Sequence, residues 1–237
     1  MRSLDILREE LHGLADPIQA EKTERFFKTG SGEYAEKDAF MGLTMPQIRK
    51  LARRHGKSLN LEDVEELLQG HWHDERALAL VWMVDAFSRG AESMKESIYK
   101  LYVKHLDLVN NWDLVDLSAP TISGGYLQKR DRSPIFAWAS SPSLWHRRVA
   151  ILTTSPWIKE GDFGDFLRIL DILQGDSEDL IRKALGWMLR EVGKVDRDVL
   201  LSELEKRAAK LAPVTLSYAM EHLDGETKKR IRAFRKG

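Results

Sequence analysis

Residues Asp74–Phe87 read DERALALVWMVDAF, and their pattern decides the fold class. Two acidic residues open the stretch, where the positive end of a helix dipole favours negative charge. Apolar residues then recur with the period of an α-helix, at positions 77, 80, 81, 84 and 87. The stretch therefore predicts an amphipathic α-helix directly after the acidic pair.

The same helical period recurs over most of the 237 residues, and convincing strand alternation is absent. It predicts further helices around residues 4–14, 48–52, 64–68, 98–106, 145–152, 163–170, 180–191, 199–204 and 216–222. Pairs of these helices recur at roughly 35 to 40 residues, the range of HEAT-like arrays. We therefore expect an all-α protein, an α–α superhelix of HEAT-like repeats that forms one domain over residues 1–237 and has a concave face.

Composition narrows the class of protein. The chain has no cysteine, which excludes disulfides, thiolate metal sites and a cysteine nucleophile and fits a reducing cytosol. The N-terminal residues Met1–Asp5 have no apolar core of signal-peptide length, and no apolar run approaches the length of a membrane span. We therefore expect a cytoplasmic protein without a membrane partner.

Charge is balanced over the chain but segregated along it. The formal net charge is zero, so a domain-wide basic excess typical of nucleic-acid binding is absent. Cations nevertheless gather in residues 47–57, which contain no acid, and in residues 127–148, where Asp131 is the single acid. If these blocks and residues 182–190 converge, the protein can hold a polyanion. The commoner alternative is that each block is a solvated helix face.

Residues 110–116, NNWDLVD, place an indole and two carboxylates within about one helical turn. Trp112 and Asp116 are four residues apart and share a helix face, whereas Asp113 is rotated to one side. An aromatic plane beside a carboxylate suits a flat substrate that develops positive charge. A purely structural interpretation is also open, with either asparagine as N-cap, Asp113 as a first-turn acid and Trp112 in the core.

Three further stretches combine with this motif. They are FMGLTMPQIR at residues 40–49, LWHRRVA at 144–150 and IRKALGWMLRE at 181–191. In order and spacing, the four together resemble the AlkD-like alkylpurine DNA glycosylases, and the resemblance runs from about residue 25 to 195. The stretch FFKTG at residues 26–30, with Tyr34 after it, is also similar to the N-terminal region of that family.

The resemblance implies a superhelix of HEAT-like helix pairs whose concave face cradles duplex DNA. Asp116 matches the catalytic aspartate of the family. Trp112 and Trp187 match the two indoles that bracket the sugar of the lesion. The residues of the family that contact DNA are matched by Arg148, Arg190, Thr44, Arg49 and Arg53. Three positions depart from the family pattern: Arg53 replaces a more typical lysine, Met45 a small polar residue and Phe26 a tyrosine.

The implied chemistry agrees with the residues present. An alkylated N3 or N7 purine is cationic and departs as a neutral base, so neither a general acid nor a metal or cofactor is needed. The sugar passes through an oxocarbenium-like state that a carboxylate and indole faces can stabilise. We therefore expect a monomeric, monofunctional DNA glycosylase acting on alkylated purines in double-stranded DNA, with no metal site. The pair His71 and His73 lacks the spacing of a helical ligand pair.

Two other functions stay open at the level of sequence. A HEAT-like protein can bind unusual DNA structures without catalysis, although here the aspartate and both tryptophans of the family pattern are kept. A protein–protein scaffold is the commonest use of such arrays, and it predicts a concave surface with mixed charges or apolar anchors. The glycine-rich loop at residues 29–34 follows a predicted helix rather than a strand, which argues against a nucleotide-binding loop.

Overall fold

The computed structural model describes residues 2–36 and 38–234. In these ranges the chain is all-α, as the sequence predicts, and its β-structure is an isolated parallel bridge between Ala39 and Trp72. None of the helices described is long and apolar enough to cross a membrane. The chain divides into two compact units, a first unit of Met1–Ile122 and a second unit of Ser123–Gly237. A single domain over the whole chain stays a prediction.

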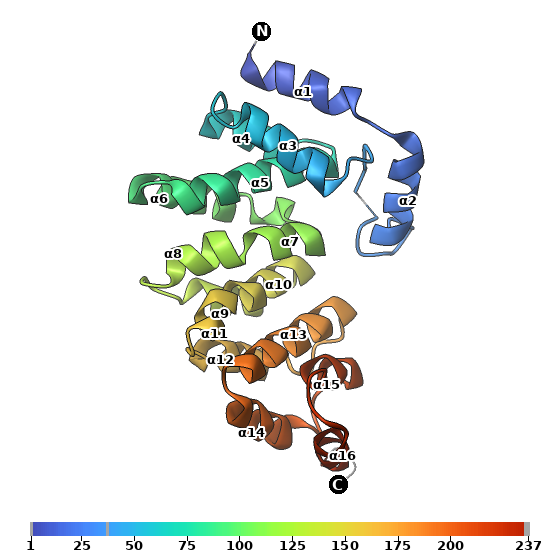
Figure 1. Ribbon diagram of the computed structural model, residues 1–237, viewed down its shortest axis with the longest axis vertical. Coiled ribbons are helices and arrows are strands. Elements are labelled where there is room, and N and C mark those ends of the chain that lie inside the picture. Colours follow the sequence, from blue (N-terminus) through green and yellow to red (C-terminus); the bar gives the residue numbers. More distant parts are fainter. Residues whose placement is uncertain (1, 37, 235–237) are drawn as a thin grey trace. The chain divides into compact units, whose positions relative to one another are not determined.

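The helices of the first unit follow one another in chain order, from blue to green in Figure 1. They are α1 (Ser3–Gly13), α2 (Pro17–Phe27), α3 (Met45–His55), α4 (Leu61–Leu68), α5 (His73–Arg89), α6 (Glu92–Lys104), the short 3-10 helix η1 (Leu106–Leu108) and α7 (Trp112–Ser118).

Local sequence explains where several of these helices begin. Asp16 precedes α2 and accepts hydrogen bonds from the backbone N–H groups of Ile18 (3.0 Å) and Gln19 (3.1 Å). Pro17 occupies the first turn, where a missing N–H costs nothing. Asn60 caps α4 by accepting from the backbone N–H of Asp63 at 2.9 Å. These caps satisfy donors that a helix N-terminus leaves unpaired.

Helix α5 is the centre of the first unit and packs against α3, α4, α6 and α7. Of the apolar residues predicted from the sequence, Ala77, Leu80 and Phe87 are buried, whereas Val81 and Val84 are half-buried. Asp74, in the first turn, is also buried and accepts hydrogen bonds from the backbone N–H groups of Met41 (2.8 Å) and Leu43 (2.9 Å). The start of α5 therefore holds the loop that leads into α3.

The second unit continues the helical pattern. A π-helical segment, η2 (Pro120–Gly124), links the two units in sequence. It is followed by α8 (Gly125–Leu127), α9 (Pro134–Ala139), α10 (Leu144–Thr153), α11 (Ser155–Lys159), α12 (Gly164–Leu173), α13 (Asp179–Val195), α14 (Arg197–Arg207), α15 (Pro213–Ala219) and α16 (Gly225–Ala233).

The long helix α13 organises the second unit and packs against α10, α11, α14 and α15. Gly186 permits its close approach to α15, because a Cβ at this position would lie 2.6 Å from the carbonyl oxygen of Thr215. The side chain of Thr215 in turn donates a hydrogen bond to the carbonyl of Arg182 at 2.9 Å. The backbones of α13 and α15 therefore come into close contact one residue before Trp187, and this packing fixes the part of α13 that carries Trp187.

Candidate functional site

The first turn of α7 carries the indole and the carboxylate that the sequence singles out. Asn111 is the N-cap, and its side chain is fully buried and accepts from the backbone N–H of Trp112 at 2.8 Å. Leu114 and Val115 face the core, whereas Trp112 and Asp116 are half-buried and lie one turn apart. An aromatic plane and a carboxylate are therefore presented together on the partly open face of a short helix.

An aromatic cluster fixes the indole of Trp112. The ring of Phe27, at the end of α2, stacks on it with a centroid distance of 5.2 Å and an interplanar angle of 15°. Phe26 meets the same indole edge-on at 5.9 Å, although 67% of Phe26 is exposed. Phe40 in turn stacks on Phe27, with a centroid distance of 5.1 Å. These contacts restrict the tilt of the indole before any substrate arrives.

The neighbouring carboxylate, Asp113, is bound to a buried histidine. The Nε2 atom of His73, the first residue of α5, lies 2.9 Å from Oδ2 of Asp113, and its Nδ1 lies 3.4 Å from Oδ2 of Asp38. Burial favours the neutral ring, but the hydrogen bond to Asp113 and the charge of Asp38 outweigh it and raise the pKa of His73 to about 9. The imidazole is therefore a cation at neutral pH.

Asp38 connects this histidine to the cap of α7. Its carboxylate accepts hydrogen bonds from Arg76 at 2.6 Å, Asn110 at 3.1 Å and Asn111 at 2.8 Å. Burial favours the neutral acid, but the interactions with His73 and Asn111 and the charge of Arg76 hold the pKa of Asp38 below its ordinary value. Neither Asp38 nor Arg76 was predicted, because these two residues are 38 apart in the sequence and the other side-chain partners of Asp38 lie 35 residues or more away.

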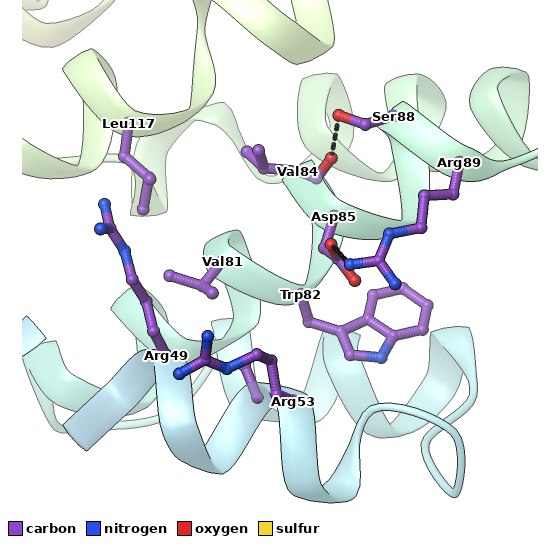
Figure 2. A pocket seen from close by; sticks show the side chains of 10 residues that line it. Arg49, Arg53, Val81, Trp82, Val84, Asp85, Ser88, Arg89 and Leu117 are labelled. Carbon is purple, nitrogen blue, oxygen red and sulfur yellow. Dashed lines mark hydrogen bonds and ion pairs between the residues drawn. The ribbon is translucent and has the colours of Figure 1, made fainter. Parts of the chain in front are cut away.

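A basic pocket lies on the first unit beside α7. It has a volume of about 400 Å³ and is lined by residues of α3, α5 and α7. Figure 2 shows Arg49 extending toward Leu117, the residue after Asp116, with Arg53 one turn further along α3. Arg89 also lines this pocket and forms an ion pair with Asp85. Two of the predicted DNA-contact residues thus share one cavity wall.

Thr44, a third predicted contact, begins the same helix. It is the N-cap of α3, and its backbone N–H and hydroxyl both donate to Oε1 of Gln47, at 2.8 and 2.6 Å. Its structural role is therefore to cap the N-terminus of α3 together with Gln47, as the sequence Thr-Met-Pro-Gln allows. Thr44 is exposed, as are Arg49 and Arg53, so all three are accessible to a ligand of α3.

The remaining predicted site residues belong to the second unit. Arg148, on α10, is buried and donates through Nη1 to the carbonyl of Leu180, near the start of α13, at 2.6 Å. Trp187, on α13, is half-buried, and its indole N–H donates to Glu191 at 3.2 Å. Arg190 lies on the same helix and forms an ion pair with Glu221. Within this unit Arg148 thus contacts the helix that carries Trp187 and Arg190.

The predicted site is therefore found in two parts. The first unit joins Trp112 and Asp116 on α7 and sets Arg49 and Arg53 in a pocket next to that helix. The second unit gathers Arg148, Trp187 and Arg190 around α13. The meeting of these two parts on one concave face stays a prediction.

Comparisons with known proteins bear on both parts. The family model described as DNA alkylation repair enzyme matches residues 7–223 of this chain. A solved structure described as a predicted DNA alkylation repair enzyme from Enterococcus faecalis is similar over 89% of this chain and 97% of its own, with a TM-score of 0.69 and 16% identity. At that identity the likeness concerns the fold. No curated protein matches.

Proposed function

Because the chain belongs to the DNA alkylation repair enzyme family, we propose that it is a monofunctional DNA glycosylase. Its substrates are positively charged N3- and N7-alkylated purines in duplex DNA, and it hydrolyses the bond between base and deoxyribose. The observation that carries this proposal is the pairing of Trp112 and Asp116 on the open face of α7, next to a pocket lined by arginines.

The reaction needs stabilisation of a cation rather than an acid. The bond between C1′ and the base nitrogen breaks, and its electron pair neutralises the alkylated base. Water then adds its oxygen to C1′ and loses a proton to Asp116 or to solvent. The carboxylate of Asp116 faces the oxocarbenium-like sugar, and the indole faces of Trp112 and Trp187 add cation–π stabilisation.

The two carboxylates of α7 have different roles in this proposal. Asp113 is engaged by the imidazolium of His73, so its charge is already compensated within the protein. Asp116 lies on the same helix face as Trp112 and supplies the negative charge that stabilises the sugar cation. Asp116 is assigned to catalysis because it shares a helix face with Trp112, and Asp113 to structure because it binds His73.

Phosphate contacts supply the affinity for duplex DNA. The exposed guanidinium groups of Arg49 and Arg53 are one turn apart, a spacing that lets them follow successive phosphates of one strand. Thr44 at the start of the same helix adds a hydroxyl and a helix N-terminus. Arg190 is proposed to bind the backbone beside the lesion, and so is Arg148 once its buried guanidinium leaves the carbonyl of Leu180.

A base-release assay on duplex DNA containing 7-methylguanine tests this function. Under single-turnover conditions, Asp116→Asn keeps the shape of the side chain and removes its charge. We expect the rate to fall about 100-fold or more, while affinity for an uncleavable abasic analogue is unchanged or higher. At pH 7, Asp113→Asn serves as the matched control and loses much less activity, because the amide oxygen of asparagine still accepts the hydrogen bond of His73.

Three results would contradict the assignment. Wild-type rates for Asp116→Asn would refute the mechanism. A larger loss in folded Asp113→Asn would mean that the catalytic carboxylate is the other one. Binding of duplex DNA by the wild-type protein without any base release would favour the non-catalytic DNA-binding alternative.

A further inference from the structure

The histidine beneath the candidate site is placed to control α7. His73 begins α5, and its backbone N–H donates to the carbonyl of Ala39 at 2.8 Å, so its position in the fold is fixed. Its side chain is only 5% exposed and points between two carboxylates, one in the loop before α3 and one in the first turn of α7. A buried cation with two acidic partners joins three segments at a single point.

We propose that His73 is a positioning residue whose imidazolium, held between Asp38 and Asp113, fixes the first turn of α7 and thereby the direction in which Asp116 faces. This role rests on the proposed glycosylase function, since it concerns the carboxylate assigned to the sugar cation. His73 does not touch the reacting atoms in this proposal. It acts through α7.

The geometry leaves α7 little freedom while the imidazolium is present. Asp113 is anchored by His73, and the N-cap Asn111 is anchored by Asp38, which His73 also contacts. The N-cap and a first-turn residue of α7 are thus tied to the same buried charge. Asp116 lies three residues beyond Asp113, so its direction follows from the rotation of α7 about its own axis.

The ring of His73 also supports the indole. It lies 4.5 Å from the ring of Phe40 and 5.4 Å from that of Phe27, centroid to centroid. Phe27 in turn stacks on Trp112. The indole of Trp112 therefore belongs to a packed row of rings that includes the imidazole of His73.

Protonation determines whether this arrangement holds. The acidic groups facing the ring are Asp38 from its loop and Asp113 from α7, and on its own helix Asp74, Glu75 and the cation Arg76 lie nearby. Loss of the proton would remove the positive partner of Asp113. We therefore expect α7 to loosen at its first turn, and Asp116 to lose its alignment, as pH rises through the pKa of His73, about 9.

The pH profile of single-turnover base release tests the proposal. We expect the wild-type rate to fall on an alkaline limb near pH 9. Asp113→Asn removes one of the charges that stabilise the imidazolium, so its alkaline limb should move about one unit or more to lower pH. A residue that merely supported the fold would change the rate without moving this midpoint.

A second carboxylate–histidine pair provides the matched control. Oε1 of Glu65, on α4, lies 2.5 Å from Nε2 of His105, the residue between α6 and η1. Glu65→Gln should leave the alkaline limb at its wild-type position. His73→Gln should be slow already at pH 7 and show no limb near pH 9. An unmoved limb in Asp113→Asn, or equal shifts in Asp113→Asn and Glu65→Gln, would overturn the proposal.

Measurements without catalysis separate this proposal from the proposed function. NMR titration of the His73 ring gives its pKa directly, and amide-exchange protection of Trp112–Ser118 reports the order of α7. We expect the amide-exchange protection of α7 to fall as pH rises, with the same midpoint as the titration of His73. If the wild-type protein releases no base at any pH, the proposed function fails. A ring titrating near 6.5, or α7 protection that ignores its titration, overturns the positioning role itself.

Discussion

The two units hold their candidate site residues by different means. In the first unit, α7 is fixed by a buried network whose members Asp38 and Arg76 have side chains only 1% and 7% exposed. In the second unit, Arg190 is held by Glu221, whose side chain is 53% exposed. Buried ion pairs are costly to break from one side, whereas exposed pairs contribute little. Breaking the network around Asp38 should therefore cost much more stability than breaking the pair of Arg190 and Glu221.

The largest expected effect is on stability, and it compares the buried network of the first unit with the exposed pair of the second. Asp38→Asn removes the charge that Arg76 and His73 share, leaving two buried cations with less compensation. We expect a loss of about 3–5 kcal/mol in the free energy of unfolding, measured by urea denaturation. Glu221→Gln, the exposed counterpart, should cost less than about 1 kcal/mol. Comparable losses in both variants would remove the distinction between the units.

The pH dependence of stability should reveal the same network. His73 has a folded-state pKa of about 9, above its ordinary value of 6.5. Its stabilising contribution is therefore complete below pH 6.5, declines as pH rises and is lost above about 9, a change on the order of 3 kcal/mol. Urea denaturation at a series of pH values measures it. His73→Gln should flatten the curve in this window, and an unchanged slope would count against a charged His73.

The salt dependence of DNA binding tests the pocket on α3. Replacing Arg49 or Arg53 by alanine should weaken duplex binding and reduce the slope of log affinity against log salt by about 1 in each case. Arg54→Ala is the control, because Arg54 lies on the same helix but pairs with Glu10 of α1. A slope that changes equally for Arg54 would mean that α3 contributes only general positive charge.

The smallest effect concerns the exposed pair of the second unit. Glu221→Gln removes one of the two carboxylates that pair with Arg190 and leaves Glu191 at 3.8 Å, so affinity for duplex DNA should rise about two- to threefold. Glu205→Gln removes the same charge from another exposed pair, with Arg230, and should change affinity less. Fluorescence anisotropy at low salt measures both. Equal gains would indicate an effect of net charge rather than of Arg190.

The parts of the fold that depend on local sequence could be predicted. The helix at Asp74–Phe87, the asparagine cap before Trp112 and the first-turn position of Asp113 follow from periodicity and capping, which act over a few residues. The short helices α8, α9 and α11 have only three to six residues and too few turns to display a period. They were not predicted.

The surroundings of the site could not be predicted in the same way. In the sequence, His73 was considered only as a metal ligand, because nothing near it signals Asp38 or Asp113. Its contacts join segments 35 and 40 residues away, and Asp38 reaches Asn111 across 73 residues. Such pairings are set by how helices pack. The motif thus predicted candidate residues of α7, whereas tertiary structure was needed to find what holds that helix.

Gly186 has a consequence for how mutational scans of this protein should be interpreted. Every amino acid that could replace it brings a Cβ, and the backbone of Thr215 already occupies that space. Loss of activity on substitution would therefore resemble the signature of a substrate contact, although Gly186 has no side chain to offer one. A screen that measures the cellular protein level as well as repair would classify Gly186 as architectural and separate its effect from that of its neighbour Trp187.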